Sequence, residues 1–102
     1  MALIPGTTPT HTLNLSIDTG TIRKLRITYE QLGRTVIEKT EKEASMSGKK
    51  IEVTLTQEDT LKFYKNQKVK VQLRALTASG TVVSHKPIVL DVDEVLNKEV
   101  LV

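Results

Sequence analysis

Few side chains in this chain are of the types that catalyse reactions or hold metal ions. The 102 residues include no Cys and only two His, His11 and His85. Neither histidine lies in a nucleophile motif such as G-x-S-x-G, and no thiolate is present to complete a zinc site. We therefore predict that the protein is not an enzyme, that it has no catalytic, cofactor-binding or metal-binding residues, and that both histidines lie at the surface.

The densest group of carboxylates is Asp91, Asp93 and Glu94. In an extended segment Asp91 and Asp93 point to one side with Glu94 beside them, and hard oxygen ligands of this kind can bind Ca²⁺. No glycine-containing ligand loop of the EF-hand type surrounds them. The pattern is more typical of the end of a strand that leads into a capped turn.

Charge is distributed unevenly along the second half of the chain. The segment 62–86 carries only basic charges, at Lys62, Lys65, Lys68, Lys70, Arg74 and Lys86. The segment 91–102 is acidic overall, with Asp91, Asp93, Glu94 and Glu99 against Lys98. Because side chains alternate between the two faces of a strand, we expect Lys68, Lys70 and Arg74 to share one face.

Three interpretations of this basic face stay open. It is a solvated outer face whose lysines discourage pairing with other sheets, it binds the tail of a neighbouring copy, or it contacts a phosphate backbone. In the second interpretation charge sets the register and apolar side chains of the tail supply the burial. Those side chains are Val95, Leu96, Val100, Leu101 and Val102. A net charge of only +3, with two Tyr and one Phe as the only aromatic residues, argues against nucleic acid.

The elements that must position these groups are strands. The sequence holds 14 Thr, 11 Val and 7 Ile, and β-branched residues favour pleated sheet. Alternation of apolar and polar residues predicts strands at 10–17, 24–30, 35–39, 51–55, 69–75, 81–84 and 88–92. Thr56 with Asp59 predicts one helical turn at 57–62, the mixed charges of 39–50 predict an exposed loop, and Pro87 predicts a kink before the last strand.

Short strands separated by turns are typical of two packed antiparallel sheets. We therefore predict an all-β fold, an immunoglobulin-like or fibronectin-III-like β-sandwich of about seven strands, without the Cys-Trp-Cys core signature of antibody domains. The expected organisation is an extended N-terminal arm at 1–9, a single domain at 10–94 and an apolar, acidic tail at 95–102. No stretch reaches the roughly 20 apolar residues of a membrane-spanning helix, so no membrane partner is expected.

Several segments resemble a group of small proteins from phages and prophages of Gram-positive bacteria, encoded in late structural gene clusters. They are LTQEDTLKF at 55–63, VKVQLR at 69–74, Gly80, VDEVL at 92–96 and IPGTTPTH at 4–11. The resemblance implies a virion or tail accessory part whose partners are other virion or tail proteins. It further implies a location in the bacterial host cytoplasm during assembly, or on the virion.

Two functions from different classes follow from these observations. The first is a structural or assembly protein that acts through protein–protein contacts, and the apolar tail suggests a homo-oligomer. The alternative is a monomeric immunoglobulin-like module that binds a carbohydrate or protein ligand through the loops 39–50 and 77–80. The two functions differ in whether the chain associates with itself.

Overall fold

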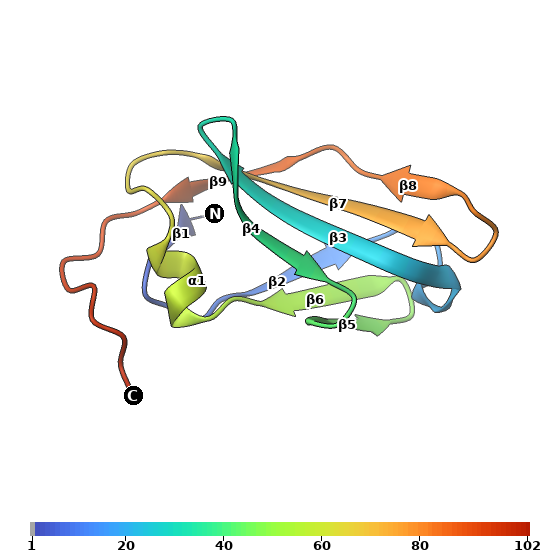
Figure 1. Ribbon diagram of the computed structural model, residues 1–102, viewed down its shortest axis with the longest axis horizontal. Coiled ribbons are helices and arrows are strands. Elements are labelled where there is room, and N and C mark those ends of the chain that lie inside the picture. Colours follow the sequence, from blue (N-terminus) through green and yellow to red (C-terminus); the bar gives the residue numbers. More distant parts are fainter. Residues whose placement is uncertain (1) are drawn as a thin grey trace.

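The computed structural model describes residues 2–102 and consists mainly of short strands (Figure 1). In chain order the elements are β1 (Ala2–Leu3), β2 (Thr10–Asn14), η1 (Thr19–Thr21), β3 (Ile22–Gln31), β4 (Arg34–Thr40), β5 (Ala44–Ser47), β6 (Lys50–Thr54), α1 (Gln57–Leu61), β7 (Val69–Thr77), β8 (Val82–Ser84) and β9 (Ile88–Val92). The all-β prediction is confirmed. No helix within residues 2–102 has both the length and the apolar character needed to cross a membrane.

The strands form two sheets. The larger has the order β1-β9-β7-β3-β4, with β8 also paired to β7, and the smaller has the order β2-β6-β5. All pairs are antiparallel except β1 with β9, in which Ala2 lies opposite Asp91 and Leu3 opposite Val92. The larger sheet is therefore mixed, because the first strand runs parallel to the last.

The apolar faces of both sheets contribute to one core. Strand β7 alternates strictly, with Val69, Val71, Leu73 and Ala75 buried and the residues between them more exposed. The other sheet contributes Leu13, Ile51 and Val53 to the same cluster. Period-2 alternation thus places one face of each strand inside, as predicted.

Glycine and proline mark two of the connections between strands, the turn at Gly33 and the break at Pro87. Leu32 and Gly33 both have positive φ, 52° and 74°, between β3 and β4, which is the geometry of the tight turns that match the twist of a hairpin. The break predicted before the last strand is present, because β8 ends at Ser84 and β9 begins at Ile88 with Pro87 in the gap. Proline has no N–H to donate to a ladder.

One sequence-based expectation is wrong in part. The segment 39–50, predicted as an exposed loop, contains the end of β4 and the whole of β5. Ala44 and Met46 are half-buried against the core, and Met46 lies opposite Ile51 in the register of β5 with β6. Pairing with a well-formed neighbour compensates for the weak strand propensity of Ala-Ser-Met-Ser.

The helical turn α1 occurs where predicted and holds the start of the chain. Thr56 and Asp59 form a reciprocal capping box. The hydroxyl of Thr60, which is fully buried, accepts from the Gly6 amide at 2.9 Å and donates to the Thr7 carbonyl at 2.9 Å. These bonds fix residues 4–9, the connection between β1 and β2, against α1.

The two ends of the chain differ in how they join the body. The segment 2–9, expected as an arm, places Leu3 in the core, and the Leu3 carbonyl accepts from the Asp93 amide at 2.9 Å. The tail leaves β9 beside α1 (Figure 1). There the side-chain amide of Gln57 donates to the Leu101 carbonyl at 2.7 Å and accepts from the Leu101 amide at 2.8 Å.

Candidate functional site

No strand formed by residues 2–102 pairs with the outer edge of β2. Hydrogen bonds of Leu15 with Lys49 and of Leu55 with Pro9 show that the odd-numbered residues of this strand face β6. In an antiparallel pair the intervening residues turn their N–H and C=O groups the other way. The backbone groups of Thr10, Thr12 and Asn14 therefore point away from β6, and none of them has a protein partner within residues 2–102.

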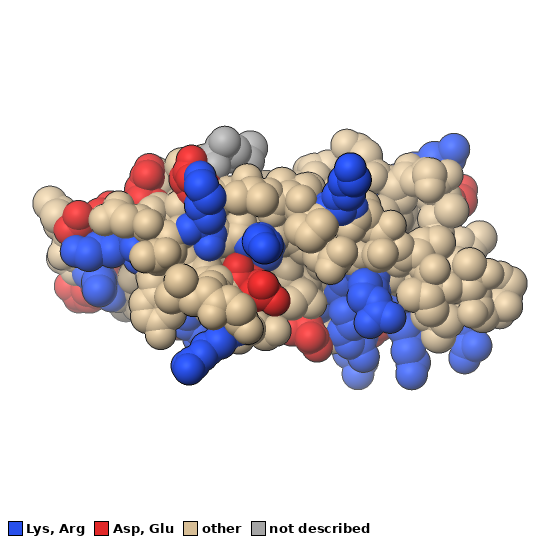
Figure 2. Space-filling view, turned by 90° about the horizontal axis from the view of Figure 1, so that it is seen from above, with Lys and Arg blue, Asp and Glu red and all other residues tan. Residues whose placement is uncertain are grey.

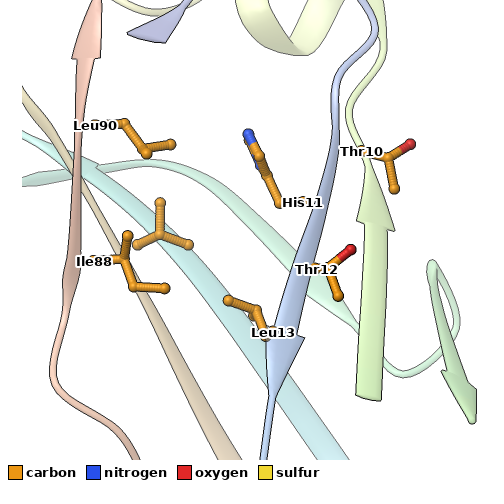
Figure 3. A pocket seen from close by; sticks show the side chains of 7 residues that line it. Thr10, His11, Thr12, Leu13, Ile88 and Leu90 are labelled. Carbon is orange, nitrogen blue, oxygen red and sulfur yellow. The ribbon is translucent and has the colours of Figure 1, made fainter. Parts of the chain in front are cut away.

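A cavity of about 220 Å³ opens beside this edge, between β2 and β9 (Figure 3). It is lined by Thr10, His11, Thr12, Leu13, Val71, Ile88 and Leu90. Leu13, Val71 and Leu90 are buried and form its floor, whereas Ile88 at the rim is 42% exposed. Between the two sheets the apolar core is thus accessible from this side.

A second cavity of about 240 Å³ continues along the same strands. It is lined by Asn14, Leu15, Ser16, Ile17, Leu73, Val83, Ser84 and His85. Its residues follow those of the first cavity at the end of β2 and just after it, on β7, and on β8 with the connection to β9. We call the two cavities together the edge groove. It runs beside residues 10–17, and its lining contains no Lys, Arg, Asp or Glu.

Both histidines line the edge groove, and both are half-buried, so the prediction that they lie at the surface is wrong in part. Nδ1 of His11 is 2.6 Å from the Tyr29 hydroxyl. Burial lowers the pKa of His11 below its ordinary value of 6.5, so its imidazole is neutral at pH 7. The pKa of the fully buried Tyr29 is raised, first by burial and then by the nearby charge of Asp59.

Asp59, whose charge acts on Tyr29, also contacts strand β4 on the side of the molecule away from the edge groove. Its carboxylate lies 2.8 Å from Nζ of Lys39, and both side chains are largely buried. Burial disfavours the charge of Asp59, but hydrogen bonds from Lys39 and from Thr56 outweigh that effect and keep its pKa below the ordinary value. The Asp59 carboxylate is therefore ionised at neutral pH, and its contact with Lys39 anchors α1 to β4.

His85 has an unsatisfied nitrogen. Its Nδ1 donates to the Lys86 carbonyl at 2.7 Å, so in the neutral ring Nε2 carries a lone pair. Nε2 is buried and has no hydrogen-bond partner among the described residues. A buried polar atom of this kind is costly unless a donor is supplied.

The three residues of the predicted basic face, Lys68, Lys70 and Arg74, differ in their neighbours in the structure. The Lys68 ammonium pairs with Asp91, and the Lys65 ammonium lies 3.3 Å from Glu94. Lys70 and Arg74 lie on the outer face of β7, where the register places Arg74 opposite Arg26. Seen from above (Figure 2), acidic and basic groups mix toward the left, where the tail leaves, and basic groups dominate the lower right.

The five predicted tail residues do not enter the core. Leu96 is 93% exposed, Leu101 is 70% exposed and Val102 is fully exposed, whereas Val95 and Val100 are half-buried. The structure brings two acidic residues that precede the tail, Glu94 and Asp91, next to Lys65 and Lys68 of the same chain. It does not bring the apolar residues of the tail next to Lys70 or Arg74.

Asp91, Asp93 and Glu94 do not converge on one point. Asp91 and Glu94 are engaged by lysines, and the Lys68 hydrogen bond and charge lower the pKa of Asp91. Within residues 2–102 no group of three His, Cys, Asp or Glu side chains is arranged to hold a metal ion.

The edge groove is not predicted from the sequence, because it depends on which strand lies at the edge of each sheet. One feature of the sequence, the position of His11 in its strand, does point to the groove. His11 lies on the same face of its strand as Leu13 and Leu15 by alternation, which points to a partly buried histidine.

Comparison with known protein families, curated proteins and solved structures finds no match to this chain.

Proposed function

We propose that the fold is immunoglobulin-like. In such domains one sheet contains strands A, B, E and D and the other contains C, F and G, with C′ beside C in the variable type. The order β2-β6-β5 corresponds to B-E-D, and the order β9-β7-β3-β4 corresponds to G-F-C-C′. This correspondence supports the proposal. It also indicates that the position of strand A, beside β2, has no strand among residues 2–102.

We further propose that the chain is a non-enzymatic structural or assembly module that acts through protein–protein contacts. The observation that carries this proposal is the combination of an open, uncharged groove with an exposed apolar tail on one small domain. An apolar-floored groove and exposed apolar side chains on one small domain are the features by which protein–protein contacts are made. A virion or tail accessory role in a phage or prophage is the setting that the sequence segments suggest, with other virion or tail proteins as further partners.

The test is the mass of the full chain in solution, measured by light scattering over a concentration series. We expect a self-associated species at high concentration. Replacing Leu96 and Val102 by Ser, both of which are exposed, should shift the chain toward the monomer without loss of stability. A strict monomer at every concentration, with no change on substitution, would contradict self-assembly through the tail.

Salt separates the two places at which the tail could dock. Docking on Lys68, Lys70 and Arg74 depends on charge and should weaken at about 0.5 M salt, where screening is short-ranged. Docking in the edge groove should persist. Because Lys68 is already paired with Asp91 of its own chain, the groove is the better supported of the two.

The alternative, a monomeric module that binds a carbohydrate or protein through its loops, is favoured by one observation. The β5–β6 turn and the β7–β8 turn both bond to the η1 segment: Thr19 N donates to Gly48 O, and Ala78 N donates to Thr21 O, each at 2.8 Å. The β5–β6 turn, within the segment 39–50, and the turn 77–80 therefore lie at one end of the domain. A monomer that binds its ligand less well when residues of 77–80 are changed would support this function.

A further inference from the structure

We propose that the edge groove binds the tail of a second copy of this chain as an added strand, antiparallel to β2, at the vacant strand-A position. This inference rests on the proposed assembly function and specifies where the contact is made. Addition of an extended segment to a free sheet edge is a common mode of recognition, in which the backbone supplies affinity and alternate side chains enter pockets.

The backbone of β2 supplies the first half of the interaction. Thr10, Thr12 and Asn14 turn their N–H and C=O groups into the open side, at alternate positions that match the bonding pattern of an antiparallel neighbour. Unpaired strand edges of this kind are usually protected by charges, prolines or bulges. The residues at 10, 12 and 14 offer none of these protections.

The groove behind the edge supplies the second half. Its floor is formed by side chains of both sheets, and its lining carries no charged Lys, Arg, Asp or Glu side chain. Its apolar floor favours a partner that presents apolar side chains, and the groove offers no Lys or Arg to pair with a phosphate backbone or an acidic peptide. Among the described residues, Nε2 of His85 is buried without a partner, in the part of the groove between Ser84 and Ile88, where an N–H donor of the incoming segment would satisfy it.

The tail has the matching properties. Residues 95–102 provide eight positions, as many as the β2 segment 10–17 that borders the groove. With Leu96 facing inward, alternation also places Val100 and Val102 in the groove. Lys98 is the one charged residue among these inward-facing positions, and its long side chain allows the ammonium to reach solvent. Leu96 and Val102 are exposed in their own chain and so are free to be buried by another.

The tail of a second copy fits better than the tail of the same chain. In its own chain the tail lies beside α1, held by the bonds between Gln57 and Leu101. Both bonds are exposed, so exchanging them for an intermolecular contact costs little. Reciprocal exchange of tails closes a two-fold dimer, whereas one-way exchange builds an open array.

The test compares two substitutions on neighbouring residues of β9. Ile88 lines the groove and is 42% exposed, whereas Val89 is 49% exposed and does not line it. Because both are surface positions, Ile88→Lys and Val89→Lys should fold equally well, which thermal melting checks. By light scattering or sedimentation we expect Ile88→Lys to weaken self-association about tenfold or more, since it places a charge in an apolar site. Val89→Lys should change it by about twofold or less.

Other outcomes separate this inference from the function on which it rests. Self-association that survives Ile88→Lys but is lost on Arg74→Glu would overturn groove docking and leave the assembly function standing. A strict monomer in the wild type would overturn both this inference and self-assembly through the tail. A second measurement does not depend on the lysine variants. Because the chain has no Cys, a Thr12→Cys chain mixed with a tagged Glu99→Cys chain should form a disulfide-linked pair under mild oxidation, and Arg74→Cys with Glu99→Cys should not. The reverse result would overturn the inference.

Discussion

The side of the molecule between β4 and β5 is closed by the chain itself, whereas the opposite side, between β2 and β9, is open. On the closed side the chain crosses directly from one sheet to the other, and Glu41 in the crossing accepts from the Leu25 amide at 3.0 Å and pairs with Arg26 at 3.3 Å. The Leu25 hydrogen bond is the main reason that the pKa of Glu41 is lowered. On the open side, the backbone N–H and C=O groups of Thr10, Thr12 and Asn14 have no such partner among the described residues.

This difference shows that the open side is not an inevitable result of the fold. A short crossing with one carboxylate is enough to bind a free backbone amide, that of Leu25 on β3. The connection between β1 and β2 could have done the same for the open side. Instead, Thr60 holds it against α1, at the end of the groove.

The largest effect should come from breaking the anchor of the closed side. Asp59→Ala removes the carboxylate half of the capping box, which accepts from the Thr56 amide, and also the partner of the largely buried Lys39, so we expect the free energy of unfolding to fall by about 2–3 kcal/mol. Chemical denaturation measures it. The control is Glu58→Ala on the same turn, where no such contact exists among the described residues and the change should stay within about 0.5 kcal/mol. Equal effects of the two substitutions would show that the anchor is unimportant.

A smaller loss of unfolding free energy is expected at the centre of the molecule, where the core meets the edge groove. Tyr29→Phe keeps the ring but leaves His11 without its partner, and we expect a loss of about 1 kcal/mol in unfolding free energy. Tyr64→Phe is the matched control, since Tyr64 is 58% exposed, and it should be neutral in the same denaturation experiment. A neutral Tyr29→Phe would mean that the His11 contact adds nothing to stability.

The strands could be predicted from the sequence because alternation depends only on neighbouring residues, as in β7 and in the hairpin around Gly33. The strand β5 could not, since Ala44 and Met46 become strand residues only through pairing with Ile51 and Val53. The groove was equally hidden, because it exists only once β2 is known to be an edge strand and β9 is known to pair with β1 only at Asp91 and Val92. Lys68 and Asp91 illustrate the converse: the complementary charges were visible, and the structure shows that they pair within one chain.

Stability should also depend on pH through the open side. The pKa of His11 is lowered in the folded state relative to 6.5, so the unfolded chain binds a proton more readily. The free energy of unfolding should therefore fall as the pH drops below about 6.5. His11→Asn keeps a polar partner for Tyr29 but does not titrate, so the pH dependence between 7 and 5 should flatten. An unchanged profile in urea titrations would assign the dependence to other groups.

The smallest effect concerns how firmly the tail is held. Gln57→Ala removes two exposed hydrogen bonds to Leu101 and should release the tail for exchange, strengthening self-association by about threefold. Gln67→Ala controls for loss of an exposed amide elsewhere and should leave association unchanged. Sedimentation over a concentration series measures both. Weaker association of Gln57→Ala would indicate that the tail acts from its place beside α1.

The most direct measurement of groove docking uses the two histidines as reporters, since His11 and His85 line opposite halves of the groove. Their imidazole NMR signals would be followed in the full-length chain as concentration is raised, at constant pH and salt. Occupation of the groove by a second copy predicts that both signals shift together, with the concentration dependence of the molecular mass, and that Ile88→Lys abolishes the shift while Val89→Lys does not. Histidine signals that stay constant while the mass rises would contradict docking in the groove.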